Sequence, residues 1–288
     1  MQIFSPIQHL QLNCSPNLYV KRDDLIDPFI SGNKWRKLKY LIAEAQNQNK
    51  THLVTFGGAY SNHLLATAAT CARFNLKSSA FVRGEEVSNE MLMLSKLYGM
   101  QLIFVDRESY RDKQNLFNSH FADDKDCLFI DEGGASYEAT LGCAEIIDEL
   151  DQHFDHIFCA AGTGTTVAGL LKGLNKHGLN TKLHIISALK GGDFLEQEIA
   201  KYENDLSKLV LHTNYHFGGY AKTTPELISF IKSFVAETGI LIDPVYTAKM
   251  FYAIKDLTAQ GIIKTDAKVL AIHTGGLFGI LGMKEKFL

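Results

Sequence analysis

Short apolar runs alternate with longer amphipathic segments along most of this chain, and no other feature of the sequence limits its fold as strongly. The short runs are rich in Val, Ile, Leu and Phe, whereas the longer segments repeat apolar residues with helical spacing. Such alternation indicates right-handed βαβ units, in which helices cover mostly parallel sheets. The sequence therefore predicts an α/β fold.

The expected strands are short, and they cover residues 18–21, 53–57, 79–82, 102–105, 128–130, 156–160, 183–188 and 269–273. The expected helices cover residues 35–46, 62–74, 89–98, 137–150, 166–174, 225–235 and 248–260. Glycines follow several of the strands, at 57–58, 133–134, 162–164 and 275–276. Because ligands of open α/β sheets collect beyond the carboxyl ends of strands, we expect these four turns to face a common cleft.

The composition narrows the range of partners and compartments. Hydrophobic residues make up 46% of the 288 positions and charged residues 21%, which is ordinary for a globular protein. A net charge of −3 without a basic run argues against nucleic acid, and the lack of a run of about 18 apolar residues argues against a membrane span. The five cysteines lack CxxC spacing and partner histidines, which favours reduced thiols in the cytoplasm and predicts no metal site.

A glycine- and threonine-rich turn follows the strand expected at residues 156–160, and it consists of Gly162, Thr163, Gly164, Thr165 and Thr166. It offers unhindered backbone N–H groups, hydroxyl groups and a helix N-terminus, which together suit a phosphate dianion. No lysine follows Gly164 as a Walker A loop requires, and Val167 stands where the dinucleotide fingerprint needs glycine. The turn favours a compact phosphate over ATP or NAD, although by itself it also fits an ordinary tight turn with a threonine cap.

Six segments occur in a fixed order along the chain: LYVKRDDL, SGNKWRKLKYL, TFGGAYSNHLLATAA, GTGTTVAG, LIDPVYTAK and HTGG. Together they resemble the 1-aminocyclopropane-1-carboxylate (ACC) deaminase and D-cysteine desulfhydrase family of fold-type-II pyridoxal phosphate (PLP) enzymes. The resemblance implies a two-domain α/β fold like that of the tryptophan synthase β subunit, with parallel sheets covered by helices and PLP in the interdomain cleft. It also implies a large PLP-binding domain of residues 1–44 and 127–288 and a small α/β domain of residues 45–126.

The resemblance also assigns residues to the cofactor. Lys34 matches the lysine that holds PLP as a Schiff base, and Lys37, one helical turn further on, matches a lysine near the phosphate. Asn62 resembles the donor to the phenolic oxygen of PLP, and Thr274 resembles a neutral partner of the pyridine nitrogen. The turn at 162–166 matches the phosphate-binding turn of the family. Without the resemblance, Lys37 fits equally well as a solvated or ion-paired lysine.

A second set of residues is assigned to the substrate and to catalysis. Ser61, Asn62 and His63 begin an expected helix and are suited to a substrate carboxylate, because a helix N-terminus attracts anions. Tyr246 and Tyr220 match tyrosines on the reacting side of the cofactor, and Ser61 is a further catalytic candidate. Taken alone, Ser61 also fits a helix N-cap, and Tyr220 also fits a packing residue.

The resemblance implies a deaminase that releases a 2-oxo acid and ammonia from a small amino acid. ACC deaminases carry a glutamate after the active-site tyrosine, near the pyridine nitrogen, whereas this chain has Thr247. We interpret Thr247, together with His63, as favouring D-cysteine desulfhydrase-like β-elimination, which also releases sulfide. ACC deaminase is the alternative, and a PLP-binding protein without lyase activity is another. The family also implies a homodimer.

Overall fold

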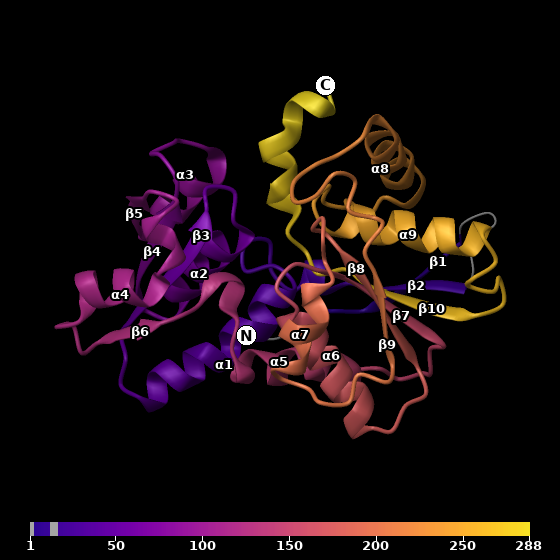
Figure 1. Ribbon diagram of the computed structural model, residues 1–288, viewed down its shortest axis with the longest axis horizontal. Coiled ribbons are helices and arrows are strands. Elements are labelled where there is room, and N and C mark those ends of the chain that lie inside the picture. The colour runs from indigo at the N-terminus through magenta and orange to yellow at the C-terminus, as the bar shows by residue number, and fades with distance from the viewer. Residues whose placement is uncertain (1–2, 12–16) are drawn as a thin grey trace.

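The apolar runs of the sequence form two separate sheets in the computed structural model, which describes residues 3–11 and 17–288 (Figure 1). The larger sheet has the strand order β1-β2-β10-β7-β8-β9, and only β1 runs antiparallel to its neighbour. Its strands are β1 (Ile7–Leu10), β2 (Asn17–Lys21), β7 (His156–Ala161), β8 (Lys182–Ser187), β9 (Leu209–His212) and β10 (Lys268–Ile272). Cys14 lies outside the described residues.

The smaller sheet is parallel throughout and has the order β5-β4-β3-β6. Its strands are β3 (His52–Gly58), β4 (Lys77–Arg83), β5 (Gln101–Val105) and β6 (Cys127–Phe129). The strand β6 begins directly after the predicted end of the small domain at residue 126, and its residues Cys127, Leu128 and Phe129 pair with β3. The division of the chain into a large and a small domain stays a prediction.

Helices cover both faces of the larger sheet, since successive residues of its strands point to opposite sides. On one face Phe158 and Ala160 pack against α8 (Pro225–Thr238) and α9 (Thr247–Ala259). On the other face Ile157 and Cys159 pack against α5 (Tyr137–Asp148), α6 (Thr165–Lys176) and α7 (Phe194–Ala200). The smaller unit carries α2 (Asn62–Arg73), α3 (Glu90–Leu97) and α4 (Lys113–Phe121). The predicted α/β fold is confirmed.

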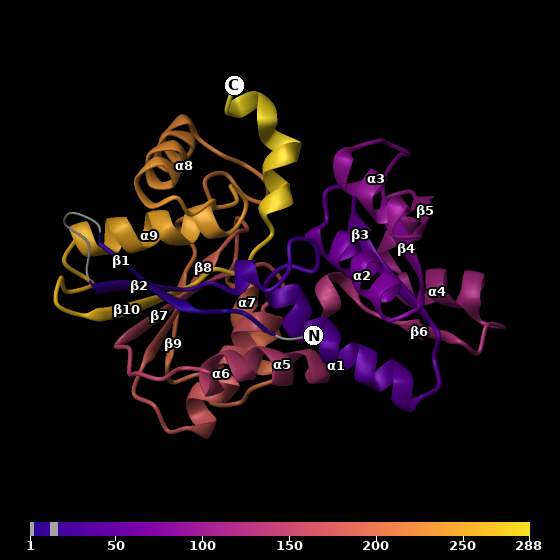
Figure 2. The same cartoon turned by 180° about the vertical axis from the view of Figure 1, so that it is seen from behind.

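The helix α1 (Asn33–Asn47) runs between the two units, as both views of the ribbon show (Figures 1 and 2). Short 3-10 turns complete the chain, at Asp23–Leu25 (η1), Ser109–Arg111 (η2), Glu132–Gly134 (η3) and Leu277–Lys286 (η4). In the part of the chain that the structure describes, no helix is long and apolar enough to cross a membrane.

Glycines let α1, α5 and α6 approach one another backbone to backbone. A Cβ at Gly142 of α5 would overlap the carbonyl oxygen of Arg36 in α1, and a Cβ at Gly169 of α6 would overlap Cys143 of α5. A third glycine, Gly173, would bring a Cβ within 2.8 Å of the Cβ of Ile147. The three helices therefore form a rigid frame that fixes the start of α1 relative to the start of α6.

Candidate active site

A cavity of about 1490 Å³ lies between the two units, at the carboxyl ends of β3, β7 and β10. All four glycine turns singled out in the sequence contribute to its lining, so the prediction that they face a common cleft is confirmed. A volume of this size exceeds the usual range for a single small ligand. It can hold a cofactor and a substrate together.

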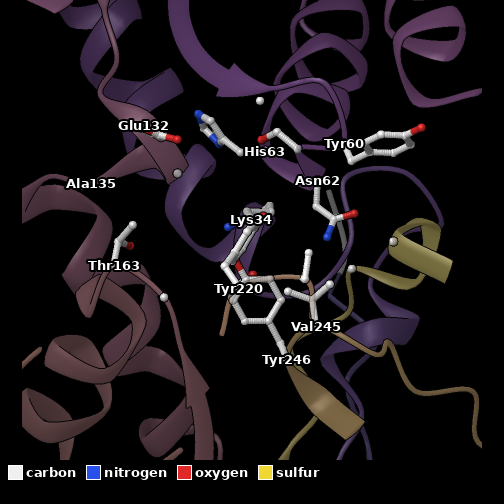
Figure 3. Close-up of a pocket in the computed structure, with 18 of the residues that line it drawn as sticks. Lys34, Tyr60, Asn62, His63, Glu132, Ala135, Thr163, Tyr220, Val245 and Tyr246 are labelled. Carbon is white, nitrogen blue, oxygen red and sulfur yellow. The ribbon is translucent and has the colours of Figure 1, made fainter. Parts of the chain in front are cut away.

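Lys34 enters this cavity from the first turn of α1, and Figure 3 shows it near the centre, with Asn62 and Thr163 to either side. Burial, with a smaller effect of the Lys37 charge, lowers the pKa of Lys34 to about 7. Burial also lowers the pKa of Lys37, whose Nζ donates a hydrogen bond of 3.0 Å to the Gly133 carbonyl oxygen. Near neutral pH a large fraction of the Lys34 amine is therefore uncharged and nucleophilic.

The turn that leads into α6 also lines the cavity. Gly164 is the N-cap of α6, with a left-handed φ of 81°, and within residues 3–11 and 17–288 no side chain caps the helix there. The first N–H groups of the helix are therefore available to an anion. Thr163 is exposed to the cavity, and Thr166 Oγ1 accepts a hydrogen bond of 2.9 Å from Asn33 Nδ2, which joins α6 to α1.

Thr165 differs from its predicted neighbours in this turn. Gly162, Thr163, Gly164 and Thr166 line the cavity, but Thr165 does not. Its side chain is fully buried, and among the described residues its hydroxyl group has no hydrogen-bond partner. The hydroxyl group of Thr165 therefore does not face the cavity, and the prediction that Thr165 binds the cofactor now depends on its backbone N–H at the start of α6.

The start of α2 forms the opposite wall, where Ser61, Asn62 and His63 all line the cavity. Ser61 is the N-cap residue, yet its side chain makes no capping hydrogen bond with any described residue. Its hydroxyl group therefore remains available to a ligand. The amide of Asn62 lies against Gly276, where a Cβ would stand 2.8 Å from Asn62 Nδ2.

His63 offers a lone pair to the cavity wall. Its Nε2 lies 2.8 Å from Thr55 Oγ1, and that hydroxyl group donates to the Ile130 carbonyl oxygen, so Nε2 carries the hydrogen. The other nitrogen, Nδ1, is buried and has no hydrogen-bond partner among the described residues. Burial, together with the charges of Lys34 and Lys37, holds the pKa of His63 well below its usual value.

Two tyrosines close the cavity on the side of the larger sheet. The rings of Tyr246 and Tyr220 meet edge to face, with centroids 6.1 Å apart, and Tyr246 lies over Gly162, where a Cβ would stand 3.2 Å from its hydroxyl oxygen. Burial raises the pKa of both hydroxyl groups, and the contact with Tyr220 raises that of Tyr246 further. Both tyrosines therefore keep their protons at neutral pH.

The buried Lys249, which was not among the predicted site residues, holds the loop before Tyr220. Its Nζ donates to the carbonyl oxygens of His216, Gly219 and Ala188, at 2.8, 2.9 and 3.1 Å. Burial lowers the pKa of Lys249 to about 8. Its position in the segment LIDPVYTAK, one helical turn after Tyr246, is the sequence signal for this role.

Thr274 and Thr247 have different environments. Thr274 lines the cavity at the end of β10, whereas Thr247 is buried and is not among the described residues that line the cavity. Thr247 Oγ1 donates to Asp243 Oδ1 and accepts from the Asp243 N–H, both at 2.8 Å. The interpretation that Thr247 faces the cofactor is therefore wrong, because Asp243 binds its hydroxyl group. Thr274 remains as the predicted neutral partner of the ring nitrogen.

Several lining residues were missed in the sequence. Arg83 reaches the cavity from the smaller unit, Glu132 from η3, and Phe278 and Met283 from η4. Arg83 ends the strand β4, so its position at a carboxyl end was a usable signal. The residues of η4 gave no such signal, because their 3-10 geometry lacks the helical spacing of apolar residues.

Comparison with known proteins assigns the family. Residues 4–275 match the model of the family described as pyridoxal-phosphate dependent enzyme. The chain belongs to this family. The enzyme is similar to a putative 1-aminocyclopropane-1-carboxylate deaminase of Thermotoga maritima, with 33% identity over 94% of this chain and 92% of that protein. It is also similar to a D-cysteine desulfhydrase of Serratia proteamaculans, with 29% identity over 90% of this chain and 86% of that protein.

Solved structures agree with this assignment. A crystal structure described as an ACC deaminase homologue has 30% sequence identity and a TM-score of 0.85, and the match covers 98% of this chain and 92% of that one. The processed form of threonine deaminase isoform 2 from Solanum lycopersicum shares the fold, with a TM-score of 0.73 at 14% identity over 98% of this chain and 86% of that one. The predicted fold-type-II architecture is confirmed.

The chemistry of the donor groups fits PLP. Lys34 supplies an amine of low pKa for the cofactor aldehyde, and the uncapped start of α6 supplies N–H groups for the phosphate. Asn62 has an amide for the phenolic oxygen, and Thr274 has a hydroxyl group for the ring nitrogen. Lys34, Asn62, Thr274 and the turn 162–166 would therefore hold the cofactor in this enzyme. When bound, PLP supplies an electron sink for charge that develops at the substrate α-carbon.

Proposed function

We propose that this PLP-dependent enzyme catalyses D-cysteine desulfhydrase-like β-elimination, converting a small amino acid such as D-cysteine and water into a 2-oxo acid, ammonia and sulfide. The observation that carries the proposal is the convergence on one cavity of a lysine of low pKa, two protonated tyrosines and an uncapped helix start. These groups provide, in order, a base, acids and an anion site.

The start of α2 would bind the substrate carboxylate. Ser61 has a hydroxyl group that no capping bond occupies within the described chain, and the first N–H groups of the helix favour a negative charge. The free Nδ1 of His63 is an acceptor, so it suits a donor such as the substrate ammonium or thiol better than the carboxylate. The substrate would therefore be oriented by α2, with its α-carbon toward Lys34.

Proton transfer would fall to Lys34 and Tyr246. With a pKa of about 7, Lys34 Nζ is matched to accept the α-proton of the substrate at neutral pH. Tyr246 keeps its proton because burial raises its pKa, so its hydroxyl group can donate a hydrogen bond to the departing sulfur. Tyr220, packed edge to face on Tyr246, would orient that ring and cover the reacting atoms.

The neutral side chain of Thr274 supports elimination over ring opening. Among the described residues that line the cavity, the carboxylates are Glu85, Asp106, Asp131, Glu132 and Glu198, which belong to the smaller unit, η3 and its flanks, and α7. Asp243, nearest in sequence to the tyrosine, instead accepts backbone N–H groups at the start of α9. An uncharged partner keeps the ring nitrogen unprotonated, which favours rapid loss of a β-substituent over a long-lived carbanion.

ACC deaminase remains the second candidate, because the Thermotoga maritima relative carries that name and a relative in Arabidopsis thaliana is named for both activities. The names agree on small amino-acid substrates. The two activities differ in the bond that is broken, because D-cysteine desulfhydrase breaks a carbon–sulfur bond and ACC deaminase opens a ring.

The decisive experiment is a substrate screen with the purified holoenzyme, using D-cysteine, L-cysteine, β-chloro-D-alanine, D-serine and ACC. We expect 2-oxo acid and sulfide from D-cysteine, and Lys34→Ala should lower turnover by roughly a thousandfold or more, because it removes both the covalent anchor and the base. The matched control is Lys39→Ala, in the same helix, which removes an ion pair with Glu145 and a contact with the Tyr40 ring but no group that lines the cavity. Turnover of ACC alone would establish the alternative function, and no turnover of any substrate would indicate a PLP-binding protein without lyase activity.

We also infer a homodimer in the cytoplasm. The cysteines in the described part of the chain, Cys71, Cys127, Cys143 and Cys159, are all buried free thiols, which is typical of a reducing compartment. The dimer rests on the family resemblance. A solution mass equal to one chain of 32.1 kDa would contradict it.

A further inference from the structure

A second polar cluster lies at the opposite end of the smaller sheet from the cavity. His52 is the first residue of β3 and Cys127 is the first residue of β6, and the two are direct partners in the parallel ladder. Asp124 belongs to the turn that precedes β6. The cavity lies at the carboxyl end of β3, whereas this cluster lies at its amino end, so the two sites are separate.

The three side chains converge on one point. Cys127 Sγ lies 3.2 Å from His52 Nδ1 and 3.2 Å from Asp124 Oδ2, and His52 Nδ1 lies 3.6 Å from Asp124 Oδ2. Tetrahedral zinc binds sulfur at about 2.3 Å and nitrogen or oxygen at about 2.0–2.2 Å, which separates its ligand atoms by roughly 3.3–3.6 Å. The cluster already has close to this spacing.

The hydrogen bonds around His52 show which of its two ring nitrogens directs a lone pair at the cluster. The Ser79 hydroxyl group donates to Gln101 Oε1 at 3.3 Å, so it must accept from His52 Nε2, which lies 2.8 Å away. The Nδ1 atom therefore carries no hydrogen while His52 is neutral, and burial lowers the pKa of His52 below its usual value. Three atoms with lone pairs, Nδ1, Sγ and Oδ2, therefore face one another. The hydrogen between them is the thiol proton of Cys127.

We propose that His52, Cys127 and Asp124 form a binding site for a divalent cation of the zinc type, which fastens β6 and its preceding turn to β3. The ligand set, one thiolate, one imidazole and one carboxylate, is typical of zinc. The bonds from His52 to Ser79 and from Ser79 to Gln101 link strands β3, β4 and β5 and would orient the imidazole, as outer hydrogen bonds commonly do at metal sites.

Exposure at the cluster supports this assignment. His52 and Cys127 are 8% and 5% exposed, whereas the Asp124 side chain is 43% exposed, so one side opens to solvent. A cation can enter there and keep a water molecule as its fourth ligand. Burial and the Asp124 carboxylate raise the pKa of Cys127 to about 12, so binding must displace the thiol proton and should strengthen as the pH rises.

This proposal departs from the expectation of no metal site. His52 and Cys127 are far apart in the sequence, and they meet only through the register of β3 and β6.

The test measures binding of Zn²⁺ and Co²⁺ to the purified holoenzyme after removal of unbound cofactor. We expect one equivalent of Zn²⁺ per chain, and a cobalt spectrum with a thiolate charge-transfer band. Cys127→Ser should abolish that band, and Asp124→Asn should weaken Zn²⁺ binding at least tenfold. Asp126→Asn, in the same turn but outside the cluster, is the matched control. Zn²⁺ should raise the melting temperature of the wild type and of Asp126→Asn, but not that of Cys127→Ser.

Two results would overturn the proposal. One is the lack of saturable Zn²⁺ binding by the wild type, which would leave the cluster as a hydrogen-bond network. The other is binding that is unchanged in both Cys127→Ser and Asp124→Asn, which would place the cation elsewhere. If Cys127→Ser does not fold, the comparison of Asp124→Asn with Asp126→Asn decides alone, because both side chains are in a surface turn.

Discussion

The helices of this enzyme begin in two ways, and the difference follows the cavity. The helices α3, α5 and α8 begin at Asn89, Ser136 and Thr224, which do not line the cavity and whose side chains accept a hydrogen bond from the first turn. At the cavity, α1, α2 and α6 begin at residues 32, 61 and 164 without any side-chain cap from the described residues. The outer helices satisfy their own N–H groups, whereas α2 and α6 leave their first N–H groups for ligands. Two other helices that begin at the cavity do not, because the first N–H groups of α1 donate to backbone carbonyl oxygens and those of α9 donate to Asp243. Bound ligand should therefore contribute to the stability of the folded enzyme.

The two ends of α6 provide the strongest test of this comparison. Gly164 at the start and Gly178 just after the end both have positive φ, 81° and 61°, so alanine at either costs about 1–2 kcal/mol of backbone strain. At Gly164 a Cβ would also press on Ile199 Cγ1 at 3.2 Å and displace the turn. We expect Gly164→Ala to weaken PLP affinity about tenfold or more, since each hydrogen bond to a charged group contributes roughly 1.5–3 kcal/mol.

Gly178→Ala is the matched control, because a Cβ there has no described neighbour within 4 Å. Because the backbone strain is similar, Gly178→Ala should lower the free energy of unfolding about as much as Gly164→Ala does. It should leave the affinity for the cofactor unchanged. The measurement is a titration of each apo-protein with PLP, together with denaturant unfolding. Equal cofactor affinity in the two variants would show that the start of α6 does not hold the phosphate.

Two serines allow a second test of smaller effect. Ser136 Oγ accepts from the Ala139 N–H at 3.0 Å, whereas Ser61 makes no capping bond within the described chain. We expect Ser136→Ala to lower the free energy of unfolding by about 1 kcal/mol with little change in kcat/KM. Ser61→Ala should instead lower kcat/KM roughly tenfold with little change in stability. The reverse pattern would mean that Ser61 acts as a cap and that the carboxylate binds elsewhere.

The third and smallest effect concerns pH. Because the pKa of Lys34 is lowered to about 7, its neutral fraction should rise from roughly a tenth at pH 6 to nine tenths at pH 8. Only the neutral amine attacks an aldehyde, so the rate of PLP capture by the apo-protein should rise through pH 7 and level off above pH 8. A lysine with the usual pKa of 10.5 would still gain about tenfold in its neutral fraction, and hence in capture rate, for each pH unit above pH 8.

The capture rate can be followed by stopped-flow absorbance, with a free lysine derivative as the reference for titration of PLP itself. Lys37→Gln should move the plateau to higher pH, because the Lys37 charge contributes to the lowered pKa of Lys34. A rate that keeps rising to pH 9 in the wild type would contradict the environment described for Lys34.

The sequence predicted the central strands of both sheets but missed two edges. Strands β1 and β9 are four residues long and lie at the two edges of the larger sheet. An edge strand pairs on one side only, so its sequence need not carry the long apolar run of a strand in the middle of a parallel sheet. The sheet to which β6 belongs was not predictable for a related reason, since only pairing with β3 assigns this short strand to the smaller sheet.

For the site, motif order predicted which segments meet at the cavity, but it did not predict the direction of every side chain. Thr165 and Thr247 each lie in the first turn of a helix, where one step in sequence rotates a side chain by about 100°. Thr247 is further fixed by Asp243, a contact that no spacing rule indicates. The cluster of His52 and Cys127 was missed because strand register joins residues 75 apart.

The glycine contacts of α1, α5 and α6 also set limits on how this enzyme can evolve. Alanine is the smallest possible replacement, yet even its methyl group would overlap backbone or side-chain atoms at Gly142 and Gly169. These two glycine positions are thus almost closed to substitution. Residues at the cavity mouth are under no such steric limit, since Tyr220 is 48% exposed. We therefore expect substrate preference to diverge among descendants through changes at the cavity mouth, while the glycines at the contacts of the three packed helices are retained.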